Sequence, residues 1–457
     1  MRIPHLRRAG TALLALGTAA GLAACSSSAT GTPATDPAAT DTSAVDSRIA
    51  VSYAGGILVL DGTTLETLAD LDAEEFTRLN PAGDGRHVLV TTSGGFQVLD
   101  TAGEPELTDL VFTADTPGHV VRHAGRTILY ADGTSDTTVF DTADLGDSDA
   151  LPEVETIPGV QAHHGVSVVL EDGTLLTTVG DSGGRTGIEV RDPSGAVVGG
   201  SDQCPGVHGE GTAADEAVVF GCEDGALLYR DGAITKLTAP DQPYGRMGNA
   251  YVSETSPIVV GDYKDDPDAE GYLLGAVALI DTVAGTLDVV DLPDGAEYTF
   301  RDIARGPGDL AYVLGAGGSI HVLDPGTGEL VGELPVIDAW EGPVQWQDPH
   351  PALAIAGGTA YVTEPAADAI HAVDLATGEI VATGSSERRR TSSPSRPADR
   401  SAGGGVCGGL LRATAEIAGS LRARLAASVL HPVTILRGAR SHWTRSAHPQ
   451  PFAGGLE

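Results

Sequence analysis

The sequence predicts an all-β protein, and within that class a β-propeller with eight blades. Three observations support this prediction: a strand pattern that repeats about every 40 to 50 residues, a glycine-rich composition, and no helical periodicity before residue 405. The 457 residues include 61 Gly and only 2 Met, and 4% are aromatic. Such a composition is typical of many short strands joined by tight turns.

Most repeats contain a strand that ends in Asp and is followed by a turn signal. These strands are Ile57–Asp61, Phe96–Asp100, Thr138–Asp141, Ala226–Asp231, Val277–Asp281, Ile320–Asp324 and Ile370–Asp374. Glycine supplies positive φ in such turns, and Asp caps them through its own side chain. Residues 48–386 therefore form the predicted propeller. Seven blades are the alternative, because the boundary between Asp231 and Gly271 is irregular.

The first repeat shows only three strands. In a closed propeller the missing strand comes from the C-terminal end, so that no blade edge stays unpaired. The pattern ends just after Gly384, where that closing strand should begin, and residues 387–457 contain 11 Arg and no Lys against 4 acidic residues. We interpret this Arg-rich tail as disordered or as the product of a frame shift. A basic tail for partner binding is the alternative.

The N-terminus predicts export. Three arginines precede the apolar run 12–20, and Leu22-Ala23-Ala24-Cys25 follows, which is typical of a lipoprotein signal peptide over residues 1–24. Cys25 would carry the lipid, and residues 25–47 would form a flexible tether. We therefore expect an extracytoplasmic protein, lipid-anchored to the outer face of the cell membrane.

Charge and cysteine content agree with that compartment. Residues 26–386 contain 13 Lys and Arg against 59 Asp and Glu, and such a surface repels nucleic acid and anionic lipid. We expect a monomer that contacts the membrane only through its lipid. Cys204 and Cys222 are expected to form a disulfide in an oxidising compartment, and a thiolate metal pair is the alternative.

Several histidines lie next to Gly or Pro where a blade would begin its innermost strand. They are His119, His163, His164, His208 and His350. Innermost strands line the channel of a propeller, so these positions are expected to converge there. Imidazoles from different strands suit a tetrahedral zinc site, to which Asp302 or Asp348 could add a carboxylate. The alternative to a metal site is that these histidines only form hydrogen bonds with water in a polar channel.

The motifs QAHHGVSV, CPGVHGE and WQDPHPALAIAGGTAYVTEP resemble the secreted zinc metallochaperones of the AztD type. The resemblance covers about residues 48–384. It implies a β-propeller with one zinc site of histidines and an aspartate, and transfer of Zn²⁺ to the solute-binding protein of a zinc ABC importer. By matching motif, the ligands would come from His119, His163 or His164, His208 and His350, with Asp302 or Asp348 as the acid.

The expected function is therefore a zinc metallochaperone and not an enzyme. Propellers also host hydrolases, so a metal-dependent, lactonase-like hydrolase with Glu210 as acid or base is one alternative. A ligand-free scaffold on the cell surface is another. The sequence contains no HExxH or Walker motif.

Overall fold

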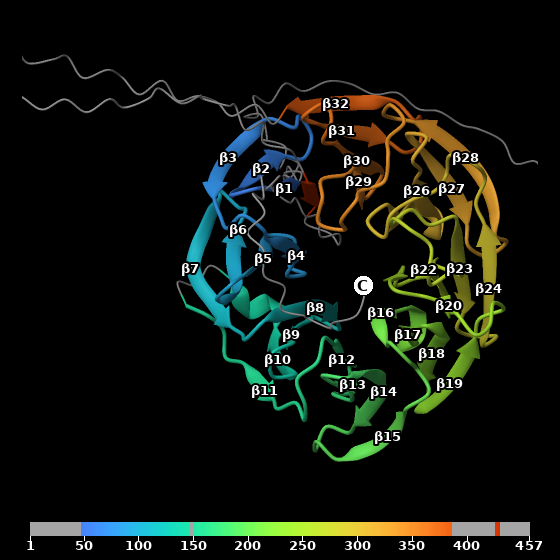
Figure 1. Cartoon of the computed structure of the whole chain (residues 1–457). Coiled ribbons are helices and arrows are strands. Elements are labelled where there is room, and N and C mark those ends of the chain that lie inside the picture. The colour runs from blue at the N-terminus through green and yellow to red at the C-terminus, as the bar shows by residue number, and fades with distance from the viewer. Residues whose placement is uncertain (1–46, 147–149, 386–425, 430–457) are drawn as a thin grey trace, which may run out of the picture. The chain divides into compact units, whose positions relative to one another are not determined.

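The computed structural model describes residues 47–146 and 150–385, and the backbone of residues 426–429. These residues form eight antiparallel sheets arranged as blades around a central axis (Figure 1). The predicted eight-bladed propeller is therefore confirmed. The predicted signal peptide, Cys25, the tether and nearly all of the Arg-rich tail lie outside the described residues, so these assignments stay predictions.

Each blade is numbered in chain order, and its strands are given from the innermost outward, except that the innermost strand of blade 1 comes from the C-terminal part of the chain and is described below. Blades 1 to 4 contain β1 (Arg48–Tyr53), β2 (Gly56–Asp61) and β3 (Thr67–Asp72); β4 (Arg78–Pro81), β5 (His87–Thr92), β6 (Gly95–Asp100) and β7 (Glu106–Thr113); β8 (Pro117–His123), β9 (Arg126–Ala131), β10 (Asp136–Asp141) and β11 (Glu155–Ile157); β12 (Ser167–Val169), β13 (Leu175–Asp181), β14 (Gly184–Arg191) and β15 (Val197–Ser201). Blades 5 to 8 contain β16 (His208–Thr212), β17 (Val218–Cys222), β18 (Asp224–Arg230) and β19 (Ala233–Thr238), with β20 (Gly245–Arg246) paired to β18; β21 (Ala250–Tyr251), β22 (Ile258–Tyr263), β23 (Ala276–Asp281) and β24 (Thr286–Asp291); β25 (Ile303–Arg305), β26 (Ala311–Leu314), β27 (Ser319–Asp324) and β28 (Glu329–Pro335); β29 (Ala352–Ala356), β30 (Thr359–Glu364), β31 (Ala369–Asp374) and β32 (Ile380–Ser385).

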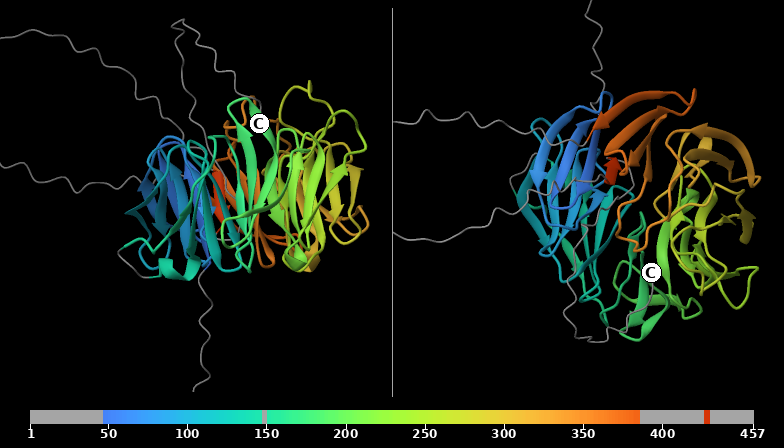
Figure 2. Two further views of the ribbon diagram at one scale, coloured as in Figure 1. Left: turned by 90° about the horizontal axis from the view of Figure 1, so that it is seen from below. Right: turned by 45° about the horizontal axis from the view of Figure 1, so that its top comes forward.

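The antiparallel order places two kinds of loop on one face of the ring. Each connection into an innermost strand lies on this face, which we call the entrance face, and so does each turn between the second and third strands of a blade. Figure 2 shows the strands running between the two faces. The turn between β9 and β10 in blade 3 is therefore on the same face as the chain entering β12 in blade 4.

Burial follows position within the blade. Second strands such as β1 and β17 are buried along nearly their whole length, because neighbouring blades cover both of their faces. The outermost strand β24 alternates between exposed and half-buried residues. The described residues also include the short 3₁₀ helices η1 (Thr142–Leu145), η2 (Ala214–Glu216) and η3 (Pro307–Asp309). None of the described helices has the length and apolar character that crossing a bilayer requires.

The ring closes between blades 8 and 1. Ile49 and Val51 of β1 pack in one core cluster with Ala354 and Ile370 of blade 8. The hydroxyl of Tyr361 donates a hydrogen bond of 2.7 Å to the carbonyl oxygen of Gly62 across the same junction. Blade 8 therefore holds blade 1 through side chains as well as through the backbone.

The innermost strand of blade 1 comes from the C-terminal part of the chain. The strand β33 (Ala426–Val429) pairs antiparallel with β1, with Ile49 opposite Val429. The sequence pattern places a closing strand directly after Gly384, whereas the structure uses residues about forty positions later. Residues 426–429 of the Arg-rich tail therefore occupy the closing position.

Candidate metal centre

Three of the predicted histidines meet at the entrance face. His119 is on β8, His164 lies in the chain entering β12, and His208 is the first residue of β16, so three successive blades contribute. The Nε2 atom of His164 lies 3.0 Å from Nε2 of His208 and 3.4 Å from Nε2 of His119. The ring centroids are 5.1 to 5.4 Å apart. We call these residues the three-histidine cluster. Among the described residues, it is the group whose ligand atoms could share one metal ion.

Partners on the outer side of the cluster set the tautomers of two rings. Nδ1 of His208 donates a 2.6 Å hydrogen bond to the carbonyl oxygen of Gly248. Nδ1 of His164 lies 2.6 Å from a carboxylate oxygen of Asp132, which can only accept. Both rings therefore present an Nε2 lone pair when neutral, and the two lone pairs face each other at 3.0 Å. Such an arrangement is repulsive unless a proton or a metal ion lies between them.

The spacing suits zinc. Two ligands of a tetrahedral zinc ion with bonds of about 2.0–2.1 Å are separated by about 3.3 Å. The separations of 3.0 and 3.4 Å within the three-histidine cluster agree with this value. Three imidazoles occupy three positions of the tetrahedron, so the fourth position remains open to water or to another ligand.

Local backbone features aim two of these histidines. The pairing register shifts between Pro117 and Val120 on β8, and again between His208 and Glu210 on β16. Bulges of this kind turn a side chain out of the regular alternation of a strand. Gly209 has a φ of +55°, and a Cβ there would lie 2.1 Å from the carbonyl oxygen of Gly248. The same carbonyl accepts from His208, so only glycine allows this close approach.

His163 points away from the three-histidine cluster. Its Nε2 lies 3.0 Å from the hydroxyl of Tyr130 and 3.1 Å from that of Thr178, and its Nδ1 contacts Ser135 and Gln161. All of its hydrogen-bonding capacity is therefore used between blades 3 and 4. A single turn of blade 3, between β9 and β10, contacts both adjacent histidines: Ser135 contacts His163, and Asp132 contacts His164. The sequence could not separate these two histidines, and the structure assigns them different surroundings.

The other three predicted ligands lie elsewhere. His350 is 4% exposed, its Nδ1 donates to the carbonyl oxygen of Asp348, and burial lowers its pKa to about 3. Asp302 is fully buried, accepts two hydrogen bonds from Thr299, and burial raises its pKa to about 8. A carboxylate oxygen of Asp348 accepts from the backbone amide of Gln345. The structure does not bring His350, Asp302 or Asp348 into the three-histidine cluster.

The carboxylate that does reach the cluster is Asp132, which sequence reasoning missed. It follows β9 in the turn ADGT, and Asp-Gly turns of this type occur throughout the propeller, so the motif carries no specific signal. In the structure its second carboxylate oxygen also accepts from the backbone amide of Gly165, at 3.4 Å. Asp132 therefore orients both the ring and the backbone of the segment that presents His164.

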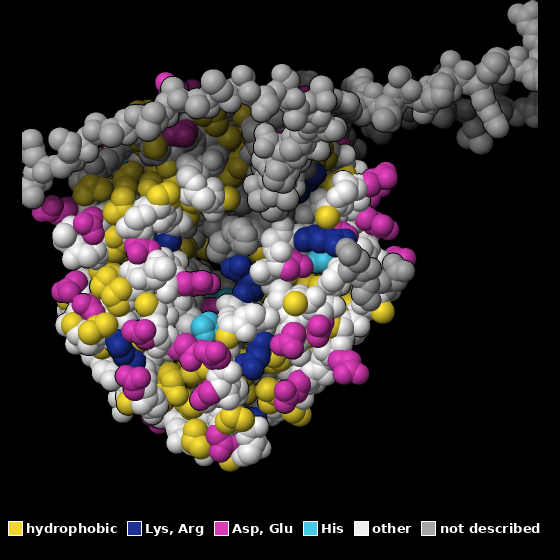
Figure 3. Space-filling model, turned by 180° about the vertical axis from the view of Figure 1, so that it is seen from behind, with side chains coloured by type: hydrophobic (Ala, Val, Ile, Leu, Met, Phe, Trp, Pro, Cys, Tyr) yellow, Lys and Arg dark blue, Asp and Glu magenta, His cyan; other side chains and the backbone are white. Residues whose placement is uncertain are grey.

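The three-histidine cluster opens onto a central cavity of about 630 Å³, which His119 and His208 help to line. Figure 3 shows Lys and Arg side chains next to the hollow at the centre of the ring, and Asp and Glu side chains spread over the surrounding face. Glu210 also lines this cavity, and burial raises its pKa to about 7. The centre of the ring thus combines imidazoles, guanidinium groups and a carboxyl group of unusual pKa.

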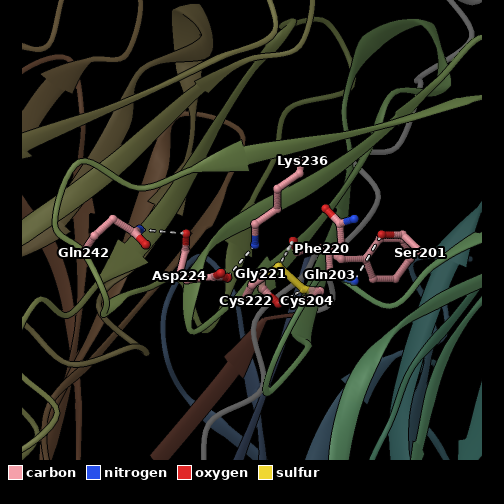
Figure 4. The surroundings of a disulfide bond; sticks show 9 residues. All are labelled: Ser201, Gln203, Cys204, Phe220, Gly221, Cys222, Asp224, Lys236 and Gln242. Carbon is pink, nitrogen blue, oxygen red and sulfur yellow. Dashed lines mark hydrogen bonds and ion pairs between the residues drawn. A yellow bond between two sulfur atoms is a disulfide. The ribbon is translucent and has the colours of Figure 1, made fainter.

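A disulfide anchors the segment that leads into His208. Cys204 and Cys222 are joined, both are fully buried, and the bond links the chain before β16 to the end of β17 (Figure 4). The predicted disulfide is therefore present, and the alternative of a thiolate metal pair does not apply to bonded sulfur atoms. The bond lies four residues before His208 and restrains the approach of that residue to the three-histidine cluster.

The Asp132→Asn variant tests the orientation of His164. Asparagine keeps the size of the side chain, but it removes the negative charge and can present its amide NH₂ to Nδ1. Loss of such a carboxylate partner typically weakens metal binding about 10- to 100-fold, and we expect zinc affinity to fall within this range. Competition with a chromophoric chelator measures it. His163→Gln is the matched control on the neighbouring ring, and a larger loss in that control than in Asp132→Asn would contradict the assignment.

Comparisons with known proteins agree with the fold and with the predicted resemblance. No family model matches the chain. The chain is 27% identical over 282 residues to the zinc chaperone AztD of Citrobacter koseri; the match covers 59% of this chain and 63% of that relative, less than two thirds of its length. Two solved structures of Citrobacter koseri AztD, one of them described as apo, share the fold, with TM-scores of 0.64 and 0.62 at 21% and 22% identity, covering 74% of this chain and 94% of theirs. The resemblance to the AztD-type zinc chaperones is therefore confirmed, in sequence by the curated relative and in fold by the two solved structures.

Proposed function

We propose that this protein is an extracytoplasmic zinc metallochaperone that passes Zn²⁺ to the solute-binding protein of a zinc ABC importer. The observation that carries the proposal is the three-histidine cluster, in which His119, His164 and His208 converge with the spacing of zinc ligands. Similarity to a protein named as a zinc chaperone supports the same role. Zn²⁺ is the cargo of this function, and these three residues are its proposed ligands.

An open fourth position suits a protein that must release its metal. An acceptor protein can supply a ligand at that position before the histidines dissociate, so that zinc is never free in solution. The hydrogen bonds from His164 to Asp132 and from His208 to Gly248 hold two ligands in place without closing the coordination sphere. The cluster therefore combines preorganised binding with access for an incoming ligand.

The proposed location rests on separate features. The disulfide between Cys204 and Cys222 fits an oxidising compartment outside the cytoplasm. Lipid attachment at Cys25, anchoring to the outer face of the cell membrane and a monomeric state are further parts of the proposal. They rest on the sequence of residues 1–47 and on the acidic charge of the body.

One observation favours a second candidate, a metal-dependent hydrolase. Catalytic zinc sites have three protein ligands and a bound water, and Glu210 lies two residues from His208 with its pKa raised to about 7 by burial. Such a group could act as a general base near neutral pH. Hydrolysis of simple lactones by zinc-loaded protein, lost in Glu210→Gln with zinc still bound, would favour this alternative over the chaperone.

The chaperone proposal predicts one tightly bound zinc ion per chain. The experiment measures metal content and zinc affinity of purified residues 26–457, and then zinc transfer to a zinc-specific solute-binding protein in the presence of excess chelator. We expect stoichiometric binding and transfer that the chelator does not intercept. Folded protein without bound zinc would contradict the binding site, and complete capture of the zinc by the chelator would contradict direct transfer.

A further inference from the structure

The central cavity is lined by more basic than acidic side chains, whereas the protein around it is strongly acidic. Residues 26–386 contain only 13 Lys and Arg against 59 Asp and Glu. Four of these 13 line the cavity, together with two acidic residues, Glu210 and Glu254. The four are Arg78, Arg122, Arg301 and Arg305. A cavity lined by guanidinium groups inside an acidic protein has the electrostatic character of an anion-binding site.

The positive charge of Arg122 is not neutralised by a nearby carboxylate among the described residues. Among the described residues no carboxylate lies within ion-pair distance of its guanidinium group, and Glu210 and Glu254 attract it only from farther away. Burial lowers the pKa of Arg122, which reflects the cost of keeping this cation away from water. A half-buried cation without a carboxylate partner is costly, and a bound anion would offset that cost.

Backbone carbonyls and aromatic rings position the other three guanidinium groups of the cavity, while Asp302 attracts Arg301 and Asp309 attracts Arg305 from outside the cavity lining. Arg301 is 3% exposed and lies over the rings of Phe300 and Trp346, with its Cζ at 4.9 and 5.8 Å from their centroids. Arg78 donates to the carbonyl oxygen of Pro117, and Arg305 donates to three other backbone carbonyls. Carbonyl oxygens and aromatic rings orient a guanidinium group but do not neutralise it.

Zinc bound at the three-histidine cluster would make anion binding in the cavity more favourable. Neutral imidazoles bring no negative charge, and the carboxylate of Asp132 behind His164 offsets only one charge of Zn²⁺, so a loaded site would add positive charge at the wall of a cavity that already contains four guanidinium groups. Repulsion between like charges is strong where water is partly excluded. A doubly charged oxyanion would relieve it, and one of its oxygens could occupy the open fourth position of the zinc ion.

We propose that the central cavity binds a small oxyanion with two negative charges, a dicarboxylate or a phosphate, held by Arg122 and its neighbouring arginines beside the three-histidine cluster. Guanidinium groups bind both chemistries through paired hydrogen bonds. A volume of about 630 Å³ accommodates such an anion together with water. The further statement that this anion completes the zinc coordination rests on the proposed function, whereas anion binding itself does not.

The first experiment uses metal-free protein, so its outcome is independent of zinc binding. Succinate and inorganic phosphate are titrated at constant ionic strength and followed by calorimetry, with acetate as the singly charged control. We expect saturable binding of succinate, phosphate or both, a weaker response to acetate, and a dissociation constant at least about tenfold higher in Arg122→Gln. Binding of succinate alone identifies a dicarboxylate site, and binding of phosphate alone identifies a compact oxyanion site.

Lys264→Gln is the matched control, because it removes a cation that lies outside the cavity lining. Arg78→Gln provides a second variant in case Arg122→Gln does not fold. Equal affinities in wild type and in every folded arginine variant, or no saturable binding of either anion, would overturn the proposal.

The second experiment tests coordination. Co²⁺ replaces zinc, and its visible absorption reports on the atoms bound to the metal. We expect the anion that binds in the first experiment to change the spectrum of the cobalt-loaded wild type, and to raise metal affinity by the same factor by which metal raises anion affinity. An unchanged spectrum with intact anion binding would overturn the coordination step alone. Failure of cobalt and zinc to bind would count against the proposed function, and anion binding to the metal-free protein would still stand.

Discussion

Replacing His208 with alanine is expected to lower zinc affinity by about three orders of magnitude, because the cluster would retain only two imidazoles. The remaining ligands are held in place: His119 by the pairing of β8 with β9, and His164 by its contact with Asp132, so neither can move into the vacant position without breaking these interactions. Competition titration with chelators of graded affinity measures the loss. A change of less than tenfold would contradict the assignment of His208 as a ligand.

The fold should survive this substitution. The side chain of His208 contributes one hydrogen bond to the carbonyl oxygen of Gly248, worth about 1 kcal/mol of stability. Zinc at a hundred times its dissociation constant stabilises wild type by about 2.7 kcal/mol, and the variant should lose this gain. His371→Ala is the control, since that ring bonds Glu364 and Thr383 within blade 8. It should bind zinc like wild type, and a loss there would mean that the strand register is misassigned.

Much of the fold was predictable because a propeller repeats one local pattern. A strand ending in Asp, followed by a Gly-containing turn, marks the third strand of most blades, as in β6 and β27. The closing strand was not predictable, since residues 426–429 follow a long stretch without the repeat and read AASV. The short strand β33 is defined by the edge of β1 with which it pairs. The four residues of β33 themselves carry no sequence signal for this pairing.

The candidate site was predictable in part. Histidines next to glycine at strand entrances identified His119, His164 and His208, but equivalent positions across an eight-bladed ring do not all converge. His350 and Asp302 belong to blades 8 and 7, whereas the three-histidine cluster comes from the adjacent blades 3, 4 and 5. The ring is wide enough that only neighbouring blades bring entrance residues within reach of one ion.

The orientation of the ligands was beyond sequence reasoning. His163 and His164 are adjacent and chemically identical, and only the turn between β9 and β10 distinguishes them. Within that turn Asp132 lies against His164 and Ser135 lies against His163. These contacts join residues about thirty positions apart, through a register that a single sequence does not define. The role of each histidine therefore depends on the tertiary contacts between blades 3 and 4.

The second large effect is expected from removing the disulfide. The bond between Cys204 and Cys222 closes a loop with a sequence separation of 18, and the chain-entropy model assigns about 3 kcal/mol of stability to a loop of this length. Cys204→Ala/Cys222→Ala should therefore unfold at lower urea concentration than oxidised wild type, with an unfolding free energy lower by about 3 kcal/mol. Urea unfolding of the metal-free proteins, followed by circular dichroism, measures this difference.

The same variant separates the stability of blade 5 from the geometry of the metal centre. The bulge at Gly209 and the hydrogen bond from His208 to Gly248 do not involve the sulfur atoms, so zinc affinity should fall by no more than about tenfold. Wild type treated with a phosphine reductant, which binds zinc weakly, should match the double variant in both measurements. A stability loss below about 1 kcal/mol would show that the strand pairing of β16 and β17 already restrains this loop without the bond. Loss of zinc binding in a folded variant would instead make the disulfide part of the machinery that positions His208.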